Sequence, residues 1–200
     1  LTGFGVADKF LGISAAGCLF QYVKDTQRTA LPHIRAIISE SASKGVVLDA
    51  ATRRNLELTM NLQGGFDNTL AEILDKSATP MGSRLLKRWL HFPLRDIEVL
   101  TNRQNTIEQI IANELYLDIH PLFKGLGDIE RIVSRIALGS ARPRDFARLR
   151  FALQQLPQLQ NYLAQADKGY IHQLGQSCLP MPALETLLEK AIVENPPVLI

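Results

Sequence analysis

The sequence predicts a mainly α-helical protein with one small β-hairpin near its N-terminal side. Along most of the 200 residues, apolar side chains recur at steps of three and four, the spacing of one helix face. Aspartate or threonine stands directly before several of these stretches, where a helix N-cap is expected. Only two short runs rich in β-branched residues favour strands. The sequence has no internal repeat and no low-complexity tract.

The composition argues against several classes of protein before any motif is considered. The 22 basic and 20 acidic residues leave a formal net charge of +2, so no strong overall field favours nucleic acid or a membrane surface. No apolar run approaches the ~20 residues that a membrane-spanning helix requires, and no charged leader precedes an apolar stretch at the start. Cys18 and Cys178 form no metal-type or redox-type spacing, which fits a reducing intracellular setting. The start without methionine and the apolar end at Pro196–Ile200 predict an excised fragment.

The N-terminal part is expected to contain both kinds of secondary structure. Apolar residues from Val6 onward fall on one face at helical spacing, which predicts a helix reaching about Thr26. The runs Ile34–Ile38 and Val46–Leu48 flank the polar stretch Ser39–Lys44, so they predict a hairpin with a long loop. A passage from strand to helix should follow directly after the second run.

Asp49 is placed to cap that next helix. The helix is expected over Ala50–Asn61, because Gln63, Gly64 and Gly65 then supply residues that tolerate a left-handed turn.

Two further helices are marked by their first residues. Thr79 and Pro80 open one in the cap-then-proline order, and Pro93 limits its extension. Asp96 is the expected cap of the other. Both are expected to bury apolar stripes against neighbouring helices, Leu85, Leu86, Trp89 and Leu90 in the first and Ile97, Leu100, Ile107 and Ile111 in the second.

The second half of the chain predicts a long helix between two shorter ones. Asp128 is expected to cap a helix that stops near Gly139. From Pro143 the three-four rhythm continues to Leu163, which predicts a long helix that Pro157 kinks or divides. A long helix packed along one stripe can act as a strut that transmits displacement between the bodies at its ends. A last amphipathic helix follows a break at two prolines, with Leu184, Leu187, Leu188, Ala191 and Ile192 on its apolar side.

No catalytic, cofactor-binding or metal-binding residues are expected in this chain. A Walker-type phosphate loop needs a glycine directly before a lysine, and no glycine in the sequence precedes a lysine. The four histidines lack the i, i+4 pairing and the nearby cysteine of a zinc site, so solvated or capping roles are favoured. Carboxylates at expected helix starts are explained by capping and the helix dipole, although a pair brought together by the fold stays open. The histidines are His33, His91, His120 and His172, and the carboxylates are Asp49, Asp96, Asp128 and Asp145.

Two groups of basic residues are the candidate contacts to a DNA backbone. One lies on a single side of the helix after Pro80, and the other gathers around the start of the long helix. The favoured alternative is that these residues solvate the outer surface or pair with acidic residues of neighbouring helices. Trp89 is expected in the core and not as a base-stacking platform. The candidate contacts are Arg84, Lys87, Arg88, Arg142, Arg144 and Arg148, and Arg150 lies beside the second group.

Three stretches go beyond generic helix, and they resemble the bacterial MutS family of DNA mismatch-repair proteins in order and approximate spacing. They are the run Leu48–Leu58 (LDAATRRNLEL), the run Thr79–Leu90 (TPMGSRLLKRWL), and the run from Gly127–Arg131 (GDIER) through Ala141–Asp145 (ARPRD). Asp25–Arg28 and Pro196–Val198 also look like pieces of the family. The resemblance therefore extends over essentially the whole chain.

The resemblance implies a multi-helical core, or lever, domain of a larger protein. Residues 1–28 would be the C-terminal end of the connector domain with a linker helix, and residues 29–200 the first half of the core domain, truncated before the DNA-gripping clamp. In the family, a separate domain reads the mismatch with an aromatic wedge two residues before a glutamate, and no Phe-x-Glu occurs here. The ATPase, with its ATP and Mg, is likewise expected elsewhere in the parent protein.

The role implied for this part is structural and allosteric. Lever helices would couple mismatch and clamp binding to the ATPase, whereas the alternative is non-specific duplex binding by the basic helix faces of the fragment itself. The partners implied are mismatched double-stranded DNA, a second MutS subunit and MutL, with no membrane. The implied location is the bacterial cytoplasm, in association with the nucleoid.

Overall fold

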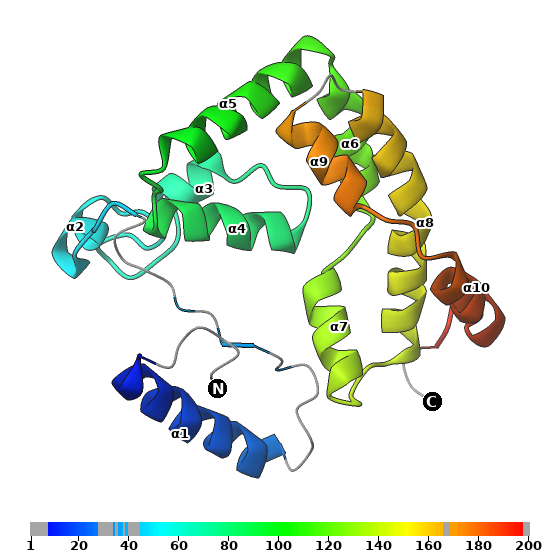
Figure 1. Ribbon diagram of the computed structural model, residues 1–200, viewed down its shortest axis with the longest axis horizontal. Helices are drawn as coiled ribbons and strands as arrows, with labels where there is room; N and C mark the ends of the chain where they lie inside the picture. The colour runs from blue at the N-terminus through cyan, green and yellow to red at the C-terminus, as the bar shows by residue number, and fades with distance from the viewer. Residues whose placement is uncertain are drawn as a thin grey trace.

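The computed structural model describes residues 8–27, 34, 36, 37, 39, 45–165 and 169–197. Within these residues the secondary structure is helical, which confirms the predicted fold class (Figure 1). The helices are α1 (Phe10–Gln27), α2 (Ala50–Asn55), α3 (Leu70–Leu74), α4 (Pro80–His91), α5 (Ile97–Ala112), α6 (Leu115–Lys124), α7 (Ile129–Ala137), α8 (Pro143–Gln165), α9 (Tyr170–Ser177) and α10 (Pro182–Ala191).

Helix α8 organises the C-terminal half of the molecule. Its 23 residues run along one side of the structure, with α7 and α10 beside its first half and α6 and α9 beside its second half (Figure 1). Each half has its own apolar core. The first core contains Ile132, Leu149, Leu153 and Leu188, and the second contains Leu115, Ile119, Leu159, Leu163 and Ile171.

The predicted long helix is confirmed, and of the two effects expected of Pro157, a kink or a division, the division is wrong. The helix passes through Pro157 without interruption. A proline inside a helix removes one backbone hydrogen bond and costs about 3 kcal/mol. Leu153, before the proline, belongs to one core, and Leu159, after it, belongs to the other. Burying two such side chains contributes roughly 3 to 6 kcal/mol, which is enough to offset that cost.

The predicted caps are confirmed at four helix starts. The side-chain oxygen of Asp49 accepts a hydrogen bond from the Thr52 amide at 2.6 Å. Thr79, Asp96 and Asp128 accept in the same way from the amide three residues further on, at 3.1, 3.2 and 3.3 Å. These hydrogen bonds satisfy amides that the first turn of a helix leaves without a partner.

The predicted β-hairpin is wrong. The described residues contain no strand, and their one isolated bridge joins Gly45 to Leu94. The amide of Val46 donates to the carbonyl oxygen of Pro93 at 2.7 Å, so this segment pairs with the chain after α4 and not with the run at 34–38. Two residues of that run, 35 and 38, lie outside the described residues, and 34, 36 and 37 adopt no strand.

Helix α2 ends at Asn55 and not at the predicted Asn61, because the chain after it pairs with the start of α3. The amide of Leu70 donates to the Glu57 carbonyl oxygen, and the amide of Ala71 donates to that of Leu58, which is 5% exposed. Glu57 takes the left-handed conformation with φ 44°. A turn that buries Leu58 therefore replaces the rest of the helix expected from the pattern.

The prediction that α5 buries its apolar stripe is wrong. Ile97, Ile107 and Ile111 are 78%, 56% and 62% exposed, respectively. Leu100, the fourth residue of that stripe, is half-buried, and Ile110, which the prediction did not include, packs against the second core. Trp89, which was expected in the core, is 41% exposed, and the Arg103 guanidinium lies over its ring, 3.8 Å from the centroid. A cation–π contact thus joins α4 to α5.

Candidate functional site: an ion-pair network joining α4, α7 and α8

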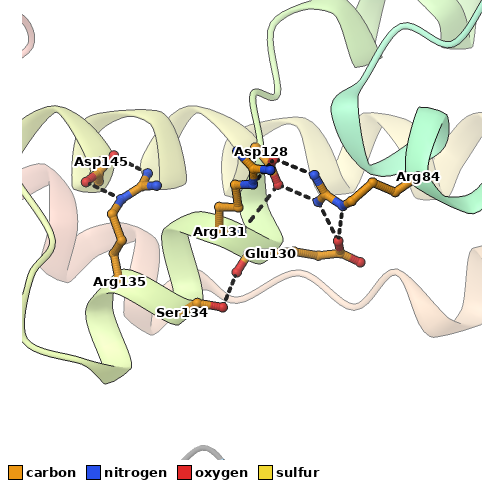
Figure 2. A network of polar contacts seen from close by, with 7 residues as sticks. All are labelled: Arg84, Asp128, Glu130, Arg131, Ser134, Arg135 and Asp145. Atoms are coloured by element: carbon orange, nitrogen blue, oxygen red, sulfur yellow. Dashed lines mark hydrogen bonds and ion pairs between the residues drawn. The ribbon is translucent and has the colours of Figure 1, made fainter. Parts of the chain in front are cut away.

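Arg84 on α4 reaches across to the first residues of α7 (Figure 2). Its Nη1 and Nη2 each donate to one carboxylate oxygen of Asp128, both at 2.7 Å. The same guanidinium donates to Glu130 Oε2 from Nε at 3.2 Å and from Nη2 at 2.5 Å. Hydrogen bonds to two carboxylates fix the orientation of the planar guanidinium, whereas an isolated surface ion pair can adopt several geometries.

Asp128 is both an acceptor for Arg84 and the cap of α7. Its side chain is 17% exposed, and it accepts from the Arg131 amide at 3.3 Å while it binds Arg84. Hydrogen bonds from Arg84 lower the pKa of Asp128 from 3.8 to about 2, with a further contribution from the Arg131 amide. The hydrogen bonds that the Arg84 guanidinium donates to the same carboxylate and to Glu130 raise the pKa of Arg84.

A second bidentate pair lies at the other end of α7. Arg135, in its last turn, donates to Asp145 on α8 from Nε at 2.9 Å and from Nη2 at 2.6 Å (Figure 2). Asp145 also accepts from the Arg142 amide at 3.0 Å, and it is 9% exposed. The hydrogen bonds from Arg135 lower the pKa of this buried carboxyl, although burial opposes that shift.

Helix α7 is thereby held to α4 at its start and to α8 at its end. Ile132, between the two pairs, is 1% exposed and packs against the first half of α8. Arg131 also reaches Asp128, with its Nε 3.4 Å from the carboxylate, but its side chain is 70% exposed. The pairs Arg84–Asp128 and Arg135–Asp145 therefore fix the position of α7, whereas the Arg131 side chain lies mostly in solvent.

The chemistry of this network is structural. At neutral pH Asp128, with a pKa of about 2, is fully ionised, and the lowered pKa of Asp145 keeps it ionised as well. A general acid or base works best with a pKa near the operating pH. The arrangement is therefore suited to fixing the positions of helices and not to moving protons.

Three candidate DNA contacts lie on α4. Arg84 is engaged by the two carboxylates, which is the ion-pairing role that the sequence favoured for such residues. Lys87 is exposed, and its charge adds slightly to the lowering of the pKa of Asp75, which is due first to the hydrogen bond from Ser83. Arg88 is exposed and also has a partner within the chain. Their contact to DNA stays a prediction.

The remaining candidates, Arg142, Arg144 and Arg148, are exposed and lie together at the start of α8. Arg144 Nε donates to the Pro196 carbonyl oxygen at 3.2 Å, and Arg144 and Arg148 line one pocket of about 330 Å³. The Cδ atom of Arg148 lies 3.7 Å from where a Cβ on Gly127 would stand. The second basic group therefore adjoins Asp128, the residue that binds Arg84.

Sequence reasoning missed the two pairs as a unit. The runs that contain Arg84, Asp128 and Asp145 were singled out, but Asp128 and Asp145 were interpreted only as caps, and Arg135 was not singled out at all. No local spacing could have paired Arg84 with a residue 44 positions away. The available signal was the alternation of arginine and acidic residues within the Gly127–Asp145 stretch.

The cysteines and histidines lie apart from this network. Cys178 packs at the edge of the second core, where burial raises the pKa of its thiol, and Cys18 is exposed. His91 Nε2 shares a hydrogen bond of 2.8 Å with Thr59 Oγ1. Across the described part of the chain, no three histidine, cysteine or acidic side chains gather as metal ligands. None of the helices in that part is both long and apolar enough to cross a membrane.

The fold and the network define a multi-helical domain, in which one long helix contacts two separate cores and a shorter helix is bound at both ends. Comparison with known families then identifies the domain. The sequence model of MutS domain III matches residues 51–200, three-quarters of the chain, and includes every residue of the ion-pair network. The chain belongs to the MutS domain III family and is a fragment of the core domain of a MutS-type mismatch-repair protein.

Proposed function

We propose that this core transmits conformational change between the mismatch-reading and ATP-hydrolysing parts of a mismatch-repair protein. The observation that supports the proposal is the pair of bidentate contacts at the two ends of α7, one to α4 and one to α8. A helix fixed in this way moves with both neighbours, so a displacement of α8 reaches α4 through charged contacts of fixed geometry. The separate cores along α8 make the long helix the lever in this proposal.

The assignment of roles to the parts follows from the family. We propose that residues 1–28 belong to the connector end and residues 29–200 to the first half of the core. ATP and Mg would bind in another part of the parent protein, so the chain itself would supply no catalytic residue. Mismatched DNA, a second MutS subunit and MutL would be partners of that whole protein.

The experiment is the mismatch-stimulated ATPase of the complete protein that contains this domain. Arg84→Gln removes both contacts to the carboxylates and should reduce the stimulation by mismatched DNA about threefold to tenfold, in the range of measured coupling changes of 0.5–2 kcal/mol. The matched control is Arg131→Gln, which removes a guanidinium from the same carboxylate on its exposed side. Equal stimulation in wild type and Arg84→Gln would reject the transmission role.

A second candidate function is direct binding of duplex DNA. It is favoured by Arg142, Arg144 and Arg148, which are exposed together and have no carboxylate within ion-pairing distance among the described residues. Binding through phosphates predicts steep salt dependence and little preference for a mismatch. The variant with Arg144→Glu and Arg148→Glu should lose this affinity at low salt, and unchanged affinity would rule the function out.

A further inference from the structure

A pocket of about 400 Å³ lies between α2, the loop that follows it and the end of α4. Its volume falls in the range of sites for small ligands, about 300–1,000 Å³. Its lining includes two basic residues, Arg53 and Arg54, and two large apolar residues, Met60 and Leu62. The pocket shares no residue with the ion-pair network, because its lining residues are His91, at the end of α4, and residues between Ala50 and Gly64.

The loop that forms this pocket is held in place by its own polar contacts. Asn61 Oδ1 accepts from the amides of Gln63 and Gly65, at 3.1 and 2.8 Å. The hydrogen bond between Thr59 and His91 ties the same loop to the end of α4 at 2.8 Å. The walls therefore exist without a ligand, which lowers the entropy cost of binding one.

The residues that line the pocket include two arginines and no carboxylate. The nearest acidic residues in sequence, Asp49 and Glu57, are outside the lining, where Asp49 accepts from the Thr52 amide at 2.6 Å and Glu57 accepts from the Leu62 amide at 2.7 Å. Arg53 Nε donates to the Leu48 carbonyl oxygen at 3.0 Å. This hydrogen bond orients the side chain and does not use its two terminal nitrogens. In the part of the chain that the structure describes, neither Arg53 nor Arg54 has a carboxylate partner.

We propose that this pocket binds a mononucleotide, with its phosphate on Arg53 and Arg54 and its base between the apolar walls. Arg53 and Arg54 both line the pocket, and two guanidinium groups suit a phosphate monoester, which bears about −1.5 to −2 charges at neutral pH and offers three acceptor oxygens. A guanidinium plane also stacks on flat rings, and the side chains of Met60 and Leu62 give such a ring apolar contact. The same group could come from a free nucleotide or from the 5′-phosphorylated end of a DNA strand.

The test is isothermal titration of the 200-residue chain with AMP and with adenosine, which differ only by the phosphate. AMP should bind at least tenfold more tightly than adenosine and than inorganic phosphate. The double variant Arg53→Gln/Arg54→Gln should lose at least tenfold in AMP affinity, and Met60→Glu, which adds a negative charge to the wall, should do the same. Arg95→Gln, an exposed arginine outside the pocket, is the matched control and should bind as wild type does.

Thermal unfolding by circular dichroism verifies that each variant is folded. Equal affinity for AMP and adenosine, AMP binding unchanged in the double variant, or no AMP binding at millimolar concentration would each overturn the proposal. Titration with a trinucleotide, with and without a 5′-phosphate, then separates the sources. Tighter binding of the phosphorylated trinucleotide than of AMP assigns the site to a strand end, and weaker binding assigns it to the free nucleotide.

Discussion

Asp128 illustrates how one side chain can hold two structural roles. It caps α7 and accepts hydrogen bonds from both terminal nitrogens of the Arg84 guanidinium. The cap was predictable, because an aspartate before an apolar-periodic stretch is a local signal. The ion pair was not, because its partner is on another helix and only the fold determines which helices meet.

The pH dependence of stability follows from this residue. Folding lowers the pKa of Asp128 from 3.8 to about 2, so its contribution is present above about pH 4 and is lost as the pH falls toward 2. The shift corresponds to about 2 kcal/mol at most, and screening at the 39% exposed Arg84 side chain reduces it to about 1 kcal/mol. Asp128→Asn should be less stable than wild type by about this amount at pH 6, and the difference should shrink toward pH 2 in urea unfolding. A constant difference over that range would contradict the assignment.

Gly175 on α9 shows a second effect at the scale of one residue. A Cβ added there would lie 2.9 Å from Leu163 Cβ and 3.5 Å from its backbone carbon, and neither atom belongs to a flexible side-chain end. Gly175→Ala should therefore destabilise the fold by about 1–3 kcal/mol, the usual cost of overpacking. Gly17 on α1 is the matched control, because nothing lies within 4 Å of its added Cβ. Gly17→Ala should be neutral or stabilising by up to about 1 kcal/mol in the same denaturant titration.

At the scale of elements, the sequence predicted helix starts better than helix surfaces. Thr79, Asp96 and Asp128 were placed correctly because capping depends on three or four neighbouring residues. The stripe of Ile97, Ile107 and Ile111 has the same spacing as a buried face, yet it is exposed. Periodicity states that one face is apolar and does not state whether another element covers it. The helices α3, α6 and α9 were not predicted individually: α3 has only five residues, and α6 and α9 begin without a side-chain cap that would mark their start.

The continuity of α8 through Pro157 gives a prediction for that element. Pro157 is exposed, so replacing it removes no packed side chain. Pro157→Ala restores a backbone hydrogen bond inside the helix and should stabilise the protein by up to about 3 kcal/mol. The measurement is the midpoint of thermal unfolding. A decrease in the midpoint would contradict this prediction. It would mean that Pro157 stabilises α8, as expected if the helix consisted of two separate segments.

At the scale of the whole molecule, stretches that resemble the family but lie far apart in sequence contact one another in the fold. The runs Thr79–Leu90 and Gly127–Asp145 supply Arg84, Asp128 and Asp145 to the ion-pair network (Figure 2). The sequence could therefore indicate which stretches matter, and the fold was needed to show that their charged residues bind one another. The candidate DNA contacts divide accordingly, because Arg84 is held by carboxylates whereas the group at the start of α8 is exposed.

The most direct test of transmission through α7 is the coupling between ATP and mismatch in the complete protein. Mismatch affinity would be measured with and without ATP, and ATP affinity with and without mismatch, since a true coupling changes both by the same factor. Arg84→Gln and Arg135→Gln should each lower that factor about threefold to tenfold, while Arg131→Gln leaves it unchanged. A factor that stays at the wild-type value in either Arg84→Gln or Arg135→Gln would contradict the role assigned to α7.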